Sequence, residues 1–196
     1  KKQIKTLTKN IRKYANDKKF PILIDEEGST VTRLRNLINH DINANYIGNL
    51  YKVNKKIAVK LYSNYLNSLC DNLLKIGINI NTIPVLDVLR KNTNKVIGVR
   101  SFSSSNKIVK ELGKITIKKC HSKKILTIIK HIPGHGCAVK DSHFKTPIVD
   151  LNEKLLDKID FSPFKSSGAK LAMTAHIVYS KIDKNNVATF SKKIIN

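Results

Sequence analysis

The chain has 196 residues, of which 41% are hydrophobic and 26% charged, and its formal net charge is +23. This composition is typical of one soluble globular domain, and because no run of roughly eighteen apolar residues occurs, we expect no transmembrane helix. The basic start also lacks the apolar segment and cleavage site of a signal peptide. The positive charge is almost all Lys spread along the chain, which indicates a compositional bias rather than a patch for nucleic acid or membrane.

Apolar periodicity predicts helices alternating with short strands along the chain. The helix at 54–76 has apolar residues at helical spacing and ends at Gly77, a residue typical of helix C-termini. The strand at 125–129 is rich in β-branched residues, which favour strands. The predicted helices are 3–14, 54–76, 105–120 and 152–159, and the predicted strands are 20–24, 78–86, 125–129 and 170–176.

Polar residues follow each predicted strand. Asp25 follows the first, Asp87 the second, Lys130 and His131 the third, and His176 the fourth. Functional residues at the C-terminal ends of successive parallel strands favour an α/β fold of the (β/α)8 TIM barrel type. A doubly wound sheet is the alternative, but no Gly-rich phosphate motif follows the first strand. Only about half of the strands of a barrel are found, so we expect a partial barrel.

The segment with the clearest chemistry is Lys130-His-Ile-Pro-Gly-His-Gly136, followed closely by Asp141 and His143. Its proline and glycines disfavour helix and strand, so 130–143 is predicted to be a loop that leaves the third strand. Asp141 lies two residues before His143, a spacing that lets the carboxylate orient the imidazole for acid/base work. The simpler alternative is that Asp141 caps a turn and His143 packs beside it.

The same residues allow a metal site as an alternative. His131, His135, Asp141 and His143 are all competent ligands. The two histidines at 131 and 135 share a face only on a helix, which Pro133 disrupts, so we expect no metal and no cofactor.

The three cysteines are widely spaced without a CxxC pair, which predicts no disulfide framework and favours a reducing compartment.

Beyond single residues, the chain resembles the β-N-acetylglucosaminidase (β-hexosaminidase) branch of glycoside hydrolase family 3. The resemblance rests on K-H-I-P-G-H-G with D-S-H and on further segments in the same order. These segments are Ile24-Asp-Glu-Glu-Gly28 with Val31 and Arg33-Leu34, Pro84-Val-Leu-Asp87, Val96-Ile-Gly-Val-Arg-Ser-Phe102 and Met173-Thr-Ala-His-Ile177. Ordered segments that cover most of the chain make a chance match improbable.

The resemblance implies a barrel that removes terminal β-linked N-acetylglucosamine with retention of configuration. It implies that His143 is the acid/base catalyst, oriented by Asp141, in place of the usual acidic carboxyl group. It also implies an N-acetylglucosamine-containing saccharide of the muropeptide type as substrate, a role in peptidoglycan turnover and a cytoplasmic location, with neither nucleic acid nor membrane as partner. The implied sugar-binding residues are Asp25, Arg33, Arg100, Lys130 and His131.

Two departures from the family pattern stand out. The Gly-Arg of the family's E-G-G-R-V motif is Ser29-Thr30 here, and a serine is strained if that glycine adopts a positive φ. The nucleophilic aspartate of the family follows a later strand, and the sequence stops soon after the helix expected from Ser191. We therefore expect residues 1–196 to be one incomplete barrel domain holding about strands two to five, with the nucleophile beyond residue 196.

Three other functions remain open at this point. A basic nucleic-acid-binding module is suggested by the charge alone and predicts affinity that falls steeply with salt. A metal-dependent hydrolase would use the same histidines. A piece without stand-alone activity is the third, because half a barrel leaves sheet edges and apolar faces uncovered.

Overall fold

The computed structural model describes residues 1–37, 42–140 and 146–195. Its centre is a parallel sheet in which each strand lies beside the next in the order β1-β2-β3-β5. The strands are β1 (Leu23–Ile24), β2 (Ile80–Asn81), β3 (Leu126–Ile132) and β5 (Leu171–Thr174). They correspond to the predicted strands in the predicted order, which confirms an α/β fold with parallel strands. The described residues form an open sheet and not a closed barrel.

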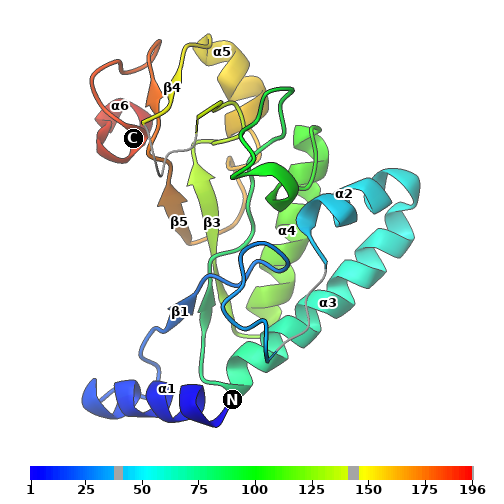
Figure 1. Cartoon of the computed structure of the whole chain (residues 1–196), viewed down its shortest axis with the longest axis vertical. Coiled ribbons are helices and arrows are strands. Elements are labelled where there is room, and N and C mark those ends of the chain that lie inside the picture. The colour runs from blue at the N-terminus through cyan, green and yellow to red at the C-terminus, as the bar shows by residue number, and fades with distance from the viewer. Residues whose placement is uncertain (38–41, 141–145, 196) are drawn as a thin grey trace.

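Three predicted helices are confirmed, namely α1 (Lys2–Tyr14), α3 (Lys55–Lys75) and α4 (Asn106–Ser122). Helix α3 begins where the Asn54 side chain accepts a hydrogen bond from the backbone N–H of Ile57, which satisfies a free donor of the first turn. It ends before Gly77, whose φ of 85° is strained for residues with a side chain. In Figure 1, α3 and α4 lie side by side on one side of the sheet.

The remaining elements are short. Helix α2 (Ala44–Val53) was not predicted, and its start is capped by Asn43, whose side chain accepts from the N–H of Tyr46. The predicted helix at 152–159 is present as α5 (Glu153–Leu156), which continues into one π-helical turn. The small pair β4 (Ile148–Val149) and β6 (Val178–Tyr179), helix α6 (Lys192–Ile195) and the 3-10 turns Gly98–Arg100 and Ala188–Phe190 complete the described elements.

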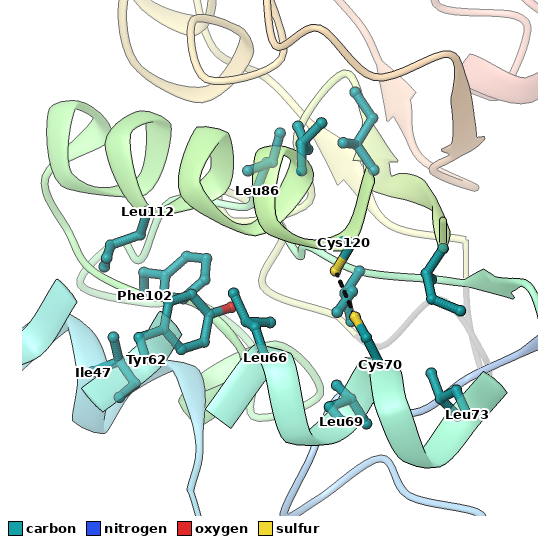
Figure 2. Close-up of a cluster of buried hydrophobic side chains, with 14 of the residues drawn as sticks. Ile47, Tyr62, Leu66, Leu69, Cys70, Leu73, Leu86, Phe102, Leu112 and Cys120 are labelled. Carbon is teal, nitrogen blue, oxygen red and sulfur yellow. Dashed lines mark hydrogen bonds between the residues drawn. The ribbon is translucent and has the colours of Figure 1, made fainter. Parts of the chain in front are cut away.

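The main hydrophobic core lies between α3, α4 and the sheet (Figure 2). We define the α3–α4 core as the buried residues of these two helices that face each other: Tyr62, Leu66, Leu69, Cys70, Leu112, Thr116 and Cys120. The Tyr62 hydroxyl shares a hydrogen bond of 2.9 Å with the Thr116 hydroxyl, and the free thiols of Cys70 and Cys120 are 3.7 Å apart. The polar atoms of this core are therefore paired within it.

One prediction about the third strand is wrong. The loop was expected to begin at Lys130, but β3 continues to Ile132, and Lys130 and Ile132 pair with Met173 and Thr174 of β5. The register shifts between these pairs, so one extra residue is accommodated on β3. Lys130 and His131 are thus held by a strand, which positions them more firmly than a loop. Within the described ranges, no helix is long and apolar enough to cross a membrane.

Candidate active site

Lys130 is the centre of a charged group at the C-terminal ends of the strands. Its side chain is 2% exposed, and its Nζ lies 2.5 Å from Glu27 Oε1 and 3.3 Å from Asp25 Oδ1. It also donates to the Thr82 hydroxyl oxygen at 2.8 Å. A buried ammonium group is tolerated only when such partners replace water. These three partners come from segments after β1 and β2, so the parallel sheet itself assembles the group.

Arg100 extends this group through Glu27. Its Nε and Nη2 donate to the two Glu27 carboxylate oxygens, each at 2.8 Å, in the bidentate geometry that suits guanidinium and carboxylate. Burial alone would raise the pKa of Glu27, but the hydrogen bonds from Arg100 and the Lys130 charge outweigh it and lower that pKa. The third nitrogen of Arg100, Nη1, donates to the backbone carbonyl oxygen of Val96 at 2.7 Å.

Asp25 presents the more accessible carboxylate. Its side chain is 38% exposed, and its Oδ2 lies 3.9 Å from Nη2 of Arg33, whose side chain is 62% exposed. Thr82 donates its hydroxyl to Asp25, and burial, which raises the pKa of Asp25, is outweighed by this hydrogen bond and by Lys130. Asp25 therefore stays ionised with an open side from which it can accept hydroxyl donors.

We call Asp25, Glu27, Thr82, Arg100 and Lys130 the strand-end cluster. Three of the predicted sugar-binding residues are members of it, and Arg33 contacts it through Asp25. Glu27, which connects Lys130 to Arg100, was not predicted as a site residue. The available signal was the match of Glu27-Gly28 to the first two residues of the family's E-G-G-R-V motif.

His131 is held by a second buried carboxylate. Its Nδ1 lies 2.7 Å from Oδ2 of Asp87, and the Asp87 side chain is fully buried. Burial raises the pKa of Asp87, but the His131 side chain and the backbone N–H of His135 lower it further than burial raises it. Asp87 was noted as a polar residue after its strand but was not assigned to the site.

A pocket of about 320 Å³ lies beside His131. It is lined by Val96, Ile97, Arg100, His131, His135, Met173, Thr174, Ala175 and His176. The His131 and His135 rings meet edge to face with centroids 5.8 Å apart, and burial lowers the pKa of His135. His176, which also lines the pocket, has its Nδ1 2.8 Å from the Thr189 hydroxyl. Arg100 lines this pocket and also belongs to the strand-end cluster, so the pocket and the cluster adjoin at Arg100.

Two of the predicted residues cannot be placed. Asp141 and His143 lie outside the described residues, so their acid/base role stays a prediction. Among the residues that the structure does describe, no group of three or more His, Cys, Asp or Glu side chains is arranged to hold a metal ion. The strain expected at Ser29 is absent, because the positive φ of this turn, 116°, falls on Gly28 instead.

Comparison with known proteins supports the same reading. Beta-hexosaminidase A of Pseudoalteromonas piscicida is 34% identical over 94% of this chain and 32% of its own length. The crystal structure of native NagZ from Neisseria gonorrhoeae matches with a TM-score of 0.90 at 29% identity, over 97% of this chain and 56% of that one. The same protein in complex with N-trifluoroacetyl-D-glucosamine matches with a TM-score of 0.92 at 28% identity, over 100% and 57% of the two chains.

The fold and the site define a parallel α/β domain with a charged cluster and an adjoining pocket at the C-terminal ends of its strands. The chain belongs to the family of the glycosyl hydrolase family 3 N terminal domain, whose model matches residues 1–196. It spans between about a third and about half the length of the curated relatives that it matches. The resemblance inferred from the ordered motifs is thereby confirmed at the level of the family.

Proposed function

We propose that this chain supplies the sugar-binding part of a retaining β-N-acetylglucosaminidase. The observation that carries the proposal is the convergence of Asp25, Arg33, Arg100, Lys130 and His131 on one site, although they come from separate segments of the sequence. The curated relatives named beta-hexosaminidase and the NagZ complex with a glucosamine derivative support the same substrate class. The site is part of a (β/α)8 barrel whose remaining strands lie outside these 196 residues.

Each group has a role that its environment allows. The half-exposed Asp25 accepts hydrogen bonds from sugar hydroxyls, and Arg33 beside it donates to them. Lys130 and Arg100 donate to hydroxyl or N-acetyl oxygens while Glu27 holds both cations in place. Many donors and acceptors held near the ends of rigid strands bind the sugar in one orientation before reaction. This lowers the entropic part of the activation barrier.

The proton transfers fall to His143 and Asp141. In this proposal His143 protonates the departing glycosidic oxygen and then activates water, and Asp141 orients its ring. A carboxylate nucleophile from a later strand of the complete barrel forms the glycosyl-enzyme intermediate. The saccharide is of the muropeptide type, and the net charge of +23 favours capture of such carboxylate-bearing products of peptidoglycan turnover in the cytoplasm.

The test is release of a chromogenic aglycone from an aryl β-N-acetylglucosaminide by the full natural polypeptide that contains this chain. Replacing His143 by Ala is expected to reduce turnover by about 10²–10⁴-fold. The matched control is His121→Ala, because His121 lies in the last turn of α4 and takes no part in the pocket. Near-normal turnover of the His143 variant would contradict the assignment, and loss in both variants would indicate a folding defect.

A further inference from the structure

Asp87 uses both of its carboxylate oxygens to hold the segment that follows β3. Oδ2 accepts from the His131 ring at 2.7 Å, whereas Oδ1 accepts from the backbone N–H groups of His131 at 3.3 Å and His135 at 2.6 Å. The side chain is fully buried, so water does not compete for these contacts. A carboxylate with this many donors around it is held in the ionised form.

An ionised carboxylate is only an acceptor, so the ring nitrogen that it contacts must carry the proton. We propose that Asp87 is a positioning residue that fixes His131 in the Nδ1–H form, so that Nε2 offers a lone pair to the pocket and the bound ligand must supply a hydrogen-bond donor there. The inference rests on the proposed function only for the identity of that ligand, a sugar with free hydroxyl groups.

The charges around the pocket explain why an acceptor matters at this position. Arg100, which lines the same pocket, and Lys130, the strand neighbour of His131, are donors without any acceptor capacity. A hydroxyl group both donates and accepts, so it is satisfied only where a donor and an acceptor lie together. His131 Nε2 supplies the acceptor. A carboxylate ligand at the same place would be repelled, because its oxygens are also acceptors and cannot donate to Nε2.

The backbone of the turn after β3 packs closely against the backbone next to Asp87. A Cβ added to Gly136 would lie 1.8 Å from the carbonyl oxygen of Val88, the residue after Asp87. The turn after β3 is therefore pressed against the Asp87 segment, and the ring of His131 and the turn that carries His135 are held by one side chain.

The first test needs no variant. In the full natural polypeptide, ¹⁵N NMR of labelled histidines in alkaline solution is expected to give a protonated-type signal at Nδ1 of His131 and an unprotonated-type signal at its Nε2. The opposite assignment in the wild type overturns the proposal. This measurement depends neither on catalysis nor on the stability of any variant.

The Asp87→Asn variant is expected to invert the tautomer. The amide oxygen of the asparagine still accepts from the two backbone N–H groups, so its NH₂ group takes the place of Oδ2. This NH₂ group donates to Nδ1 of His131, and the ring proton therefore moves to Nε2. Asp160→Asn is the matched control, because Asp160 is also a fully buried carboxylate but pairs with Arg90. A folded Asp87 variant with the wild-type tautomer, or inversion in the control, overturns the proposal.

Binding of N-acetylglucosamine by titration calorimetry separates this inference from the proposed function. The Asp87→Asn variant is expected to bind the sugar about tenfold or more weakly than the wild type, while the control binds it normally. Equal binding by a variant with an inverted tautomer overturns the acceptor role. A wild type that has the Nδ1–H form but does not bind the sugar contradicts the proposed function and leaves the tautomer assignment intact.

Discussion

Lys130 of the strand-end cluster and the α3–α4 core are both closed to water, yet they are stabilised in opposite ways. In the α3–α4 core, Leu66 and Leu69 are 0% and 1% exposed and contact other apolar groups. In the strand-end cluster, Lys130 is equally buried but contacts two carboxylates and a hydroxyl group. Apolar burial is favourable for each side chain alone, whereas a buried charge is tolerated only together with its partners.

This difference matches the different tasks of the two regions. The core stabilises the chain and needs only the right volume and shape, so it tolerates conservative exchange. The strand-end cluster keeps donors and acceptors in fixed directions before a ligand arrives, which is what a binding site requires. The following predictions test whether the two regions differ in energy and in pH response as this comparison implies.

The largest expected effect is in the core. Replacing Leu66 by Ala removes a fully buried side chain and leaves a cavity, and we expect a loss of about 3–5 kcal/mol in the free energy of unfolding. Urea denaturation of the full natural polypeptide measures it. Leu74→Ala on the same helix is the matched control, because Leu74 is 41% exposed and its loss is expected to be much smaller. Equal losses in the two variants would refute the assignment of this core.

The second effect is in the strand-end cluster. Replacing Lys130 by Met keeps an unbranched side chain but leaves the carboxylates of Asp25 and Glu27 without their shared cation. We expect a loss of about 3 kcal/mol in the free energy of unfolding, because removing one member of a buried ion pair leaves the other charge buried without a partner.

The control for Lys130 is Lys181→Met. Lys181 pairs with Asp150 at 3.3 Å, but the two side chains are 59% and 65% exposed, so we expect no measurable change in stability. A Lys130→Met variant as stable as this control would mean that the strand-end cluster gains nothing from its charges. It would also weaken the argument that this site is rigid before a ligand binds.

The sequence predicted the elements with strong periodicity and the residues with a distinctive motif. Helices α1, α3 and α4 follow from their apolar spacing, and Arg33, Arg100 and Lys130 follow from ordered motifs. Helix α2 was missed, although Asn43 before it is a typical cap. The start of the loop was placed at Lys130 because the proline and glycines that follow disfavour a strand, whereas pairing with β5 extends the strand to Ile132.

Glu26 and Glu27 show what a sequence cannot separate. They are chemically identical neighbours, but Glu26 Oε2 accepts from the backbone N–H groups of Arg33 and Leu34, whereas Glu27 binds Lys130 and Arg100. Alternation along a strand does not decide between them, because β1 has already ended at Ile24. The family motif marks the position of Glu27, but what Glu27 binds follows only from the positions of the two cations, which come from distant segments.

The smallest expected effect concerns the dependence of folding stability on pH, which changes in acid and in alkaline solution but hardly at neutral pH. The pKa values of Glu27 and Asp87 are lowered in the folded chain, so the unfolded chain binds more protons in acid. Their stabilisation is therefore complete above the ordinary carboxyl pKa of about 4 and is lost as pH falls through the lower folded values. Asp160 opposes this in part, because burial raises its pKa.

The α3–α4 core responds in the opposite range. Burial raises the pKa of Tyr62, so its phenol stays protonated in the folded chain at a pH where the unfolded chain ionises. Its contribution is complete below the ordinary tyrosine pKa of about 10 and is lost as pH rises beyond it. Urea midpoints measured across both ranges should therefore fall at each end. The Glu27→Gln variant is expected to reduce only the acid loss and Tyr62→Phe only the alkaline loss; a variant that changes both ends would mean that the two regions unfold as one electrostatic unit.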